Sequence, residues 1–301
     1  MNFSVFINEI TARVQAIVGE DASVEIQVIR KNNNVLLHGM SIMHKRYNVS
    51  PTIYLEGFYE MLQDGMDMDS VVSRLLSIYV KGLPKNKVDM EFFMDFEQVK
   101  ERIVYRLINR EKNAELLKDI PHVDFLDLTI CFYYSYEHFE LGEGMILIHN
   151  SHMEMWHTNH QELMHLAERN TPRLLPVQLE SMDQAMVGIL NEEQLEEFRK
   201  LQKETNRYMY VLTNNRKNQG AAVILYPGVL AETARKLGGG FYILPSSIHE
   251  VILLVDREQS HGEELHEMIA DINQSQVQEE EVLSDYAYWY DAETGKVTEI
   301  R

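Results

Sequence analysis

The chain has 301 residues, and its 47 Asp and Glu outnumber its 28 Lys and Arg, which gives a formal net charge of −19 at pH 7. A surface of this charge repels phosphate backbones and anionic lipids, so nucleic acid and membrane partners are disfavoured. The length suffices for one large or two ordinary domains with a full apolar core.

Cysteine usage and the first residues indicate the compartment. Cys131 is the single cysteine, so no intramolecular disulfide can form, and a reducing cytoplasm fits best. The first 18 residues carry apolar side chains at helical spacing and lack the basic head of a signal peptide. No run reaches the roughly 18 apolar residues of a membrane span. We therefore expect a soluble cytoplasmic protein.

The first third of the chain predicts helices around one hairpin. Apolar spacing predicts a surface helix over residues 3–18. Val24–Arg30 and Val35–Met43 are typical of strands, and the asparagines between them favour a tight turn. A helix is predicted from Pro51 to Gly65, and another follows the capping Asp67. The Gly and Pro of residues 81–87 then indicate a subdomain boundary.

The remaining elements follow in the same way. Helical spacing predicts helices, and runs of β-branched and aromatic residues predict strands. The expected helices are 96–108, 154–168 (interrupted at Asn170–Pro176), 182–190, 192–204, 228–237 and 260–272. The expected strands are 125–136, 144–149, 208–213, 221–225, 241–244, 250–255 and the two halves of a last hairpin around Glu293–Gly295.

These elements predict an α+β protein with antiparallel β-hairpins followed by helices. A hairpin-then-helix unit begins near Val24, Phe125 and Tyr208, so the hypothesis is three repeated ββα units. The predicted domains are an N-terminal α+β subdomain at 1–85 and a C-terminal α+β domain at 86–301. The alternative divides the latter into two ββα-type subdomains, 86–176 and 177–301.

Three segments carry a resemblance to a known family. They are YLEGFY within VSPTIYLEGFYEML (Val49–Leu62), NTPRLLP (Asn170–Pro176) and YILPSSIHEVI within FYILPSSIHEVILLV at 241–255. Together with YVLTN and GAAVILYPGVL they resemble an uncharacterised family of clostridial Firmicutes proteins, a domain of unknown function, over nearly the whole chain. The resemblance implies a bacterial protein, and it implies no activity, cofactor or functional residue.

Two groups of residues have the chemistry for catalysis or metal binding. Ser246, Ser247, His249 and Glu250 place hydroxyl, imidazole and carboxylate groups within five residues. The alternative interpretation is a turn whose serines bind backbone groups, and no G-x-S-x-G elbow is present. Histidines also gather at His149, His152, His157, His160 and His165, but only two pairs have a ligand spacing of three.

The aromatic end of the chain predicts a binding surface. Tyr286, Tyr288 and Tyr290 alternate along one strand, so they are expected to share one face, and a chain end can lie at a sheet edge. We therefore expect a non-catalytic binding or regulatory protein for an unidentified protein or small ligand, with no cofactor, in contact through residues 286–290 and the loop Pro245–Glu250. The alternative is a hydrolase or metal-dependent enzyme that uses the catalytic group or the histidine cluster.

Overall fold

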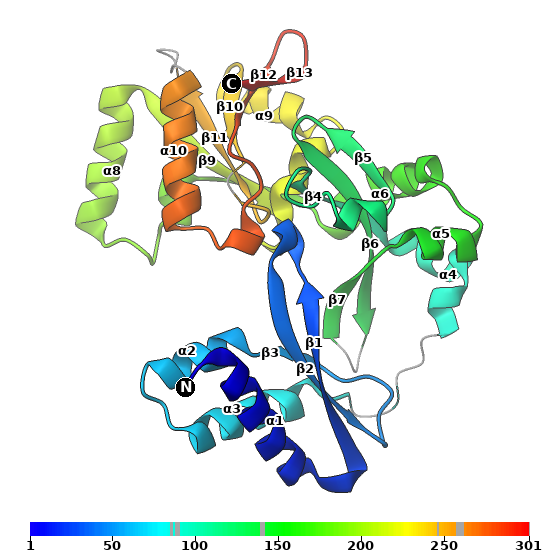
Figure 1. Cartoon of the computed structure of the whole chain (residues 1–301). Coiled ribbons are helices and arrows are strands. Elements are labelled where there is room, and N and C mark those ends of the chain that lie inside the picture. Colours follow the sequence, from blue (N-terminus) through cyan, green and yellow to red (C-terminus); the bar gives the residue numbers. More distant parts are fainter. Residues whose placement is uncertain (85–86, 88–90, 139–141, 246, 257–261, 301) are drawn as a thin grey trace. The chain divides into compact units, whose positions relative to one another are not determined.

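A computed structural model describes the chain except for residues 85–86, 88–90, 139–141, 246, 257–261 and 301 (Figure 1). Its helices and antiparallel sheets confirm the α+β class. The chain divides into two compact units. Unit 1 comprises Met1–Met94 and Tyr136–Gly144, and unit 2 comprises Asp95–Ser135 and Met145–Arg301. None of the helices in the described part of the chain has the length and apolarity that a bilayer crossing requires.

Unit 1 contains a three-stranded antiparallel sheet with helices on one face. Its strands, in spatial order, are β1 (Ala22–Arg30), β2 (Leu36–His44) and β3 (Thr52–Tyr54). Its helices are α1 (Phe3–Val18), α2 (Glu56–Gln63) and α3 (Met68–Gly82). The side chain of Asn2 caps α1 by accepting from Val5 N, and Asp67 caps α3 by accepting from Ser70 N. The β1–β2 hairpin that we predicted is confirmed.

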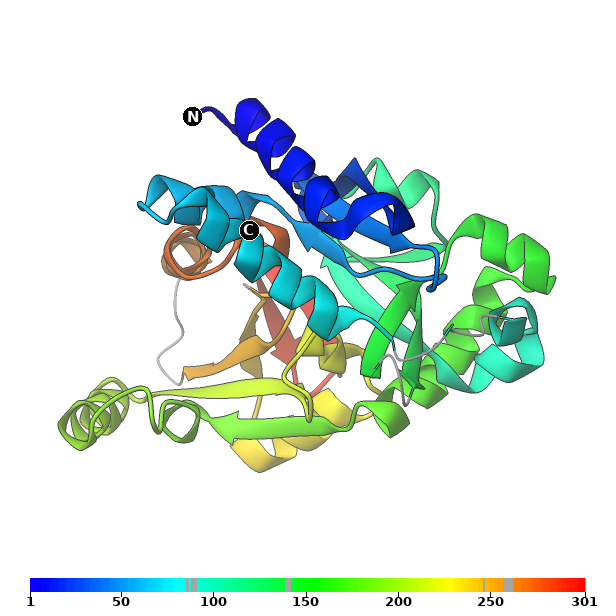
Figure 2. The ribbon, with the colours of Figure 1, turned by 90° about the horizontal axis from the view of Figure 1, so that it is seen from below.

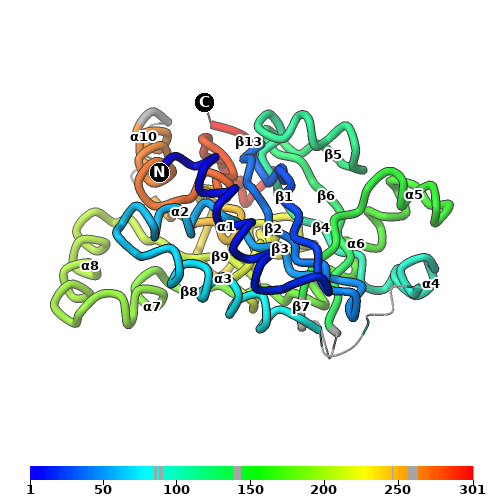
Figure 3. The backbone as a smooth tube through the Cα atoms, turned by 60° about the horizontal axis from the view of Figure 1, so that its bottom comes forward, coloured from blue at the N-terminus to red at the C-terminus, as the bar shows by residue number. Residues whose placement is uncertain are grey.

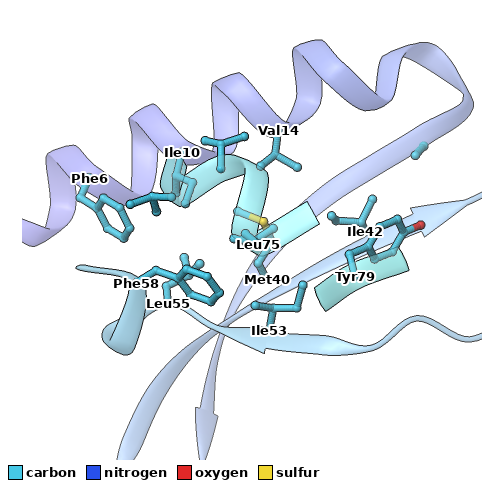
Figure 4. Packing of buried hydrophobic residues seen from close by; sticks show 13 residues of the cluster. Phe6, Ile10, Val14, Met40, Ile42, Ile53, Leu55, Phe58, Leu75 and Tyr79 are labelled. Carbon is cyan, nitrogen blue, oxygen red and sulfur yellow. The ribbon is translucent and has the colours of Figure 1, made fainter. Parts of the chain in front are cut away.

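The core of unit 1 lies between these helices and β2. Phe6, Ile10 and Val14 recur every four residues along α1 and are fully buried. Figure 4 shows them directed toward the sheet and α3, where the cluster is completed by Met40, Ile42, Ile53, Leu55, Phe58, Leu75 and Tyr79. Burying each large apolar side chain contributes about 1.5–3 kcal/mol, so this cluster is the main source of stability in unit 1.

The helix predicted from Pro51 begins later than expected. Thr52–Tyr54 form β3, which pairs with Ser41–Gly39 of β2, and the helix starts at Glu56. Thr52 and Ile53 are β-branched and Tyr54 is aromatic, and such residues favour a strand where a neighbouring strand offers pairing.

Unit 2 contains two sheets. The six-stranded sheet has the order β13-β12-β10-β11-β9-β8, and in the second sheet β6 lies between β4 and β5 and also pairs with β7. The first sheet consists of β8 (Val177–Ser181), β9 (Arg207–Asn214), β10 (Phe241–Leu244), β11 (Val251–Asp256), β12 (Ala287–Asp291) and β13 (Lys296–Ile300). The second consists of β4 (Ile103–Asn109), β5 (His122–Phe125), β6 (Leu128–His138) and β7 (Gly142–Leu147), and β6 and β7 extend into unit 1.

Unit 2 also contains helices, several of which pack on its two sheets. They are α4 (Phe96–Val99), α5 (Asn150–Trp156), α6 (His160–Leu174), α7 (Met182–Ala185), α8 (Glu192–Thr205), α9 (Val229–Leu237) and α10 (Gly262–Ser275). Leu265 and Ile269 of α10 pack on Tyr242, Leu244 and Ala287 of the six-stranded sheet. In Figure 2 the lime strands β8 and β9 lead to α8, and Figure 3 traces α7 and α8 side by side next to them.

The helix predicted over residues 96–108 is wrong. Only Phe96–Val99 form α4, and Ile103–Asn109 form β4, which pairs with β6 along its whole length. Every residue of β4 except Arg106 is buried, so its apolar residues serve both faces of a sheet rather than one face of a helix. The helix predicted over 182–190 is also shorter, since α7 ends at Ala185.

The prediction of a hairpin between residues 208–213 and 221–225 is also wrong. Residues 220–225 form a 3₁₀ helix, η6 (Gly220–Leu225), and β9 pairs with β8 and β11 instead. The hypothesis of three ββα units therefore fails at its third copy. Asn170–Leu174 were expected to interrupt a helix, yet they form the last turn of α6 with Pro172 inside it.

Candidate functional site

The loop Pro245–Glu250 joins β10 to β11, and the structure places its imidazole between two fixed partners. His249 Nδ1 lies 3.2 Å from the backbone N of Gln219, and its Nε2 lies 3.1 Å from Glu281 Oε1. Because a backbone N–H can only donate, Nδ1 is the acceptor and Nε2 carries the proton that Glu281 accepts. Both ring nitrogens are therefore used inside the fold.

The described hydroxyl of this loop, that of Ser247, bonds to the backbone. Ser247 Oγ accepts a hydrogen bond from the backbone N of its neighbour His249 at 3.0 Å, as in the turn that the sequence offered as the alternative to catalysis. Ser246 lies outside the described residues. The carboxylate that the His249 imidazole meets is Glu281, while Ser247 bonds to the His249 backbone.

The carboxyl of Glu250, at the end of this loop, has a raised pKa. Burial raises the pKa of its carboxyl, and the nearby Glu281 carboxylate raises it further, whereas His249 and Lys217 act in the opposite direction. A raised carboxyl pKa means that the charged form is disfavoured in the folded state. At neutral pH the buried charge of Glu250 therefore lowers the free energy of unfolding, and protonation of this carboxyl removes that loss.

Replacing Glu250 by glutamine is expected to stabilise the protein at pH 7, because the buried charge disappears. The gain is below about 1 kcal/mol, since the side chain is partly exposed and solvent screens it. Because the folded pKa lies above the usual value of 4.5, the gain should shrink as the pH falls through the folded pKa and vanish below 4.5. Urea denaturation of both proteins at pH 7 and pH 4 measures it, and an equal difference at both pH values would contradict it.

The histidine cluster lies on two helices and in the turn between them. His152 Nδ1 accepts from the backbone N of His149 at 3.1 Å, so its Nε2 carries the proton and is not free to bind a metal. Burial lowers the pKa of His152, and the neighbouring His149 lowers it further, which keeps the ring neutral. His157 ends α5 in the left-handed conformation at φ 53°.

The other two histidines of the cluster lie on α6. His160 and His165 line a shallow hollow of about 310 Å³ together with Met164 and Glu168. Within the described residues, no three His, Cys, Asp or Glu side chains are grouped closely enough to hold a metal ion. The five histidines therefore divide into a pair at the start of α5, one cap and a second pair on α6.

Tyr288 and Tyr290 share one face of the C-terminal strand, but that face is buried. Tyr288 and Tyr290 are buried in β12, which lies between β10 and β13 and is thus an inner strand rather than a sheet edge. Tyr286 precedes β12 and is 36% exposed, and its ring stacks on His266 of α10 with a centroid distance of 6.1 Å. Tyr290 stacks on Phe241 of β10 at 5.2 Å.

Tyr290 also lines a hollow in unit 2. Its volume is about 450 Å³, and three aromatic rings reach it from separate elements: Phe125 at the end of β5, Tyr226 before α9 and Tyr290 in β12. The remaining lining residues are Ile224, Leu225, Pro227, Gly228, Leu230, Ala231, Gly295 and Val297. None of these side chains is charged, so the hollow suits an apolar or aromatic group.

Two features of the structure were missed by the sequence interpretation. In unit 1, His38 and Glu56 form a hydrogen-bonded pair although they lie far apart in the sequence. In unit 2, Arg106 of β4 packs 4.4 Å from the ring centroid of Tyr133 and donates to the sulfur of Met145. Burial lowers its pKa, and its Nε is buried without a hydrogen-bond partner in the described chain. No motif in the sequence marks either feature.

The architecture is that of an α+β protein with antiparallel sheets. Unit 2 carries the hollow beside Tyr290 and the loop Pro245–Glu250, whose His249 ring is hydrogen-bonded on both nitrogens. The chain belongs to a family of unknown function (DUF5688), whose model matches residues 3–292. A search of curated proteins returned no match. A search of solved structures also returned no match.

Proposed function

We propose that this chain is a non-catalytic binding protein of the bacterial cytoplasm, with a regulatory role, and that it takes an apolar or aromatic group into the hollow beside Tyr290. The observation that carries the proposal is the convergence of Phe125, Tyr226 and Tyr290 on one hollow without a charged side chain in its lining. The clostridial origin implied by the sequence motifs is part of the same proposal.

The size and the walls of the hollow support a small ligand or one side chain of a partner. Ligand pockets have volumes of about 300–1,000 Å³ and are lined mainly by apolar and aromatic groups with a few polar ones. Tyr226 is held in place because its hydroxyl donates to Leu175 O at 2.8 Å, and Tyr290 is held by stacking on Phe241. Rings fixed in this way lose little freedom when a ligand binds.

The polar loop gives less support to the alternative of a hydrolase. A nucleophilic serine needs a base within hydrogen-bond reach, and the base needs an unprotonated nitrogen directed at the hydroxyl. His249 instead accepts a backbone N–H on Nδ1 and donates to Glu281 from Nε2. The hydroxyl of Ser247 receives the backbone N–H of His249.

Replacing Ala231 by phenylalanine is expected to weaken binding in the hollow at least tenfold. Ala231 is exposed on α9 and lines the hollow, so a larger side chain occupies the ligand volume without disturbing the core. Ligand-observed NMR with a library of aromatic fragments should detect binding to the natural protein, weakened at least tenfold in the variant, which is about 1.4 kcal/mol.

The matched control places the same ring on another exposed helix. Glu197→Phe on α8 adds an exposed phenylalanine far from the lining residues in sequence, and it should leave fragment binding unchanged. Fragments that bind Ala231→Phe as well as the natural protein, or a library without any binder, would contradict the proposal.

A further inference from the structure

In unit 1, His38 carries its ring proton on Nδ1, whereas His249 and His152 carry theirs on Nε2. Glu56 Oε1 accepts two hydrogen bonds from the same residue: one from the backbone N of His38 at 2.7 Å and one from its Nδ1 at 2.9 Å. Glu56 opens α2, where the helix dipole favours its negative charge. The carboxylate therefore fixes both the position and the tautomer of His38.

The consequence is an unprotonated ring nitrogen, on a ring that also packs edge-on against Phe3 with 5.0 Å between the centroids. With Nδ1 donating to a carboxylate, the Nε2 of the neutral ring carries a lone pair, and the side chain of His38 is 32% exposed. His44 on the same strand is the opposite case, since its Nδ1 accepts from the backbone N of Arg46 at 3.1 Å and its Nε2 carries the proton. His38 thus has the nucleophilic nitrogen that His44, His152 and His249 lack.

The neighbours of His38 on the sheet add a positive charge. His38 pairs with Val28 and Leu36 pairs with Arg30, so all four side chains lie on one face of the β1–β2 ladder. Arg30 and His38 are diagonal neighbours, about 7–8 Å apart in such ladders, which is within reach of a long side chain. The Arg30 guanidinium donates one N–H to Asn34 Oδ1 and has further N–H groups that can donate to a phosphoryl group. Val28 and Leu36 are both more than half exposed, so this part of the face is accessible.

We propose that His38 is a phosphoryl-acceptor residue, with Glu56 as the group that orients it and Arg30 as the cation that receives the transferred group. The Nε2 lone pair attacks the phosphorus of a phosphoramidate or acyl phosphate donor. The bond between phosphorus and the donor nitrogen or oxygen breaks, and its electron pair leaves with that atom. The new Nε2–P bond makes the ring cationic, and the carboxylate of Glu56, still bonded to Nδ1–H, neutralises it.

Other histidines of the chain serve as internal controls, because their Nδ1 atoms have different partners and their labelling rates can be compared with that of His38. His122 and His266 donate from Nδ1 to backbone carbonyls, at 3.0 and 2.8 Å, so their Nε2 has a lone pair and their Nδ1 is bonded to a carbonyl instead of a carboxylate. Incubation of the full chain with phosphoramidate, followed by peptide mapping in alkaline buffer, reads all of them in one reaction. The expected order of initial rates is His38 first, then His122 and His266, and last His44, with His38 at least about tenfold ahead of His44.

Three variants separate the roles of these residues. His38→Gln should remove the fastest label, and Glu56→Gln should slow labelling of His38 about tenfold, the usual effect of losing an orienting carboxylate. Arg30→Gln should slow labelling by phosphoramidate several-fold but leave modification by diethyl pyrocarbonate, an uncharged electrophile, unchanged. Circular dichroism and the rate at His266 show whether each variant remains folded.

Two results would overturn the proposal that His38 accepts a phosphoryl group. Labelling of His38 no faster than that of His44 and His266, or an unchanged rate in Glu56→Gln, would overturn the proposal. Reaction with diethyl pyrocarbonate but none with phosphoramidate would overturn the phosphoryl assignment, because it would show an open imidazole without affinity for a phosphoryl group.

Discussion

Replacing Gly220 by alanine is expected to destabilise the protein by about 3 kcal/mol, because backbone atoms occupy the space that a Cβ needs. A Cβ at this position would lie 2.5 Å from His249 O and 2.7 Å from Asn214 N, and it would also meet the hydroxyl of Thr213. The Gly220 N–H donates to the same His249 carbonyl at 2.8 Å, so the two segments cannot separate without losing that bond. Urea denaturation at pH 7 measures the loss.

The matched control is Gly57→Ala. Gly57 lies in α2, and a Cβ added to it would meet no atom within 4 Å, so alanine should be neutral or stabilise by about 0.5–1 kcal/mol through its higher helix propensity. A loss below about 1 kcal/mol for Gly220→Ala would show that the loop yields easily, which contradicts the close packing at Gly220.

The second large effect is expected for Asp127→Ala, which should destabilise unit 2 by about 3 kcal/mol. Asp127 lies in the turn between β5 and β6, and its carboxylate accepts from Ser284 Oγ at 2.7 Å and from the hydroxyl of Tyr288 at 2.5 Å. Both donors belong to residues without solvent exposure, so alanine would remove the carboxylate that accepts from two buried hydroxyls. Ser284 would keep its contacts with the backbone of Tyr286. The burial that raises the pKa of Tyr288 makes this loss costly.

Asp124→Ala provides the control for charge alone. Asp124 forms an ion pair with Arg110 at 3.2 Å, and both side chains are about half exposed, so the pair contributes little. Its loss should change the unfolding free energy by less than about 0.5 kcal/mol. Thermal unfolding in which both variants lose the same amount would contradict the role given to the buried hydroxyls.

The α+β class and most elements could be predicted because their signals are local. The first helix, the β1–β2 hairpin, α8, α9 and the β10–β11 pair follow from spacing and turn residues. The sequence of β4 was ambiguous, because Ile103, Val104, Leu107 and Ile108 fit helical spacing as well as a strand buried on both faces. Only the pairing with β6 and the cover from α6 decide between them.

The candidate sites depend on contacts that the sequence does not contain. The partner of His249 is Glu281 rather than Glu250, because the chain returns to the loop after α10 and places Glu281 O against Ile248 N at 2.9 Å. The pairing of His38 with Glu56 likewise requires β3 to lie beside β2. Residues 220–225 have the composition of a strand, but the close approach of Gly220 to His249 O sets a 3₁₀ turn there.

The division of the chain bears on how the molecule can be dissected. Unit 1 takes its residues from two stretches, Met1–Met94 and Tyr136–Gly144, because β6 and β7 pass from one unit into the other. A fragment that stops at Met94 lacks Tyr136–Gly144, and a fragment that starts at Asp95 carries that stretch without the rest of unit 1. Separate expression of either half therefore calls for a re-engineered junction, such as a short linker in place of Tyr136–Gly144, rather than a simple truncation.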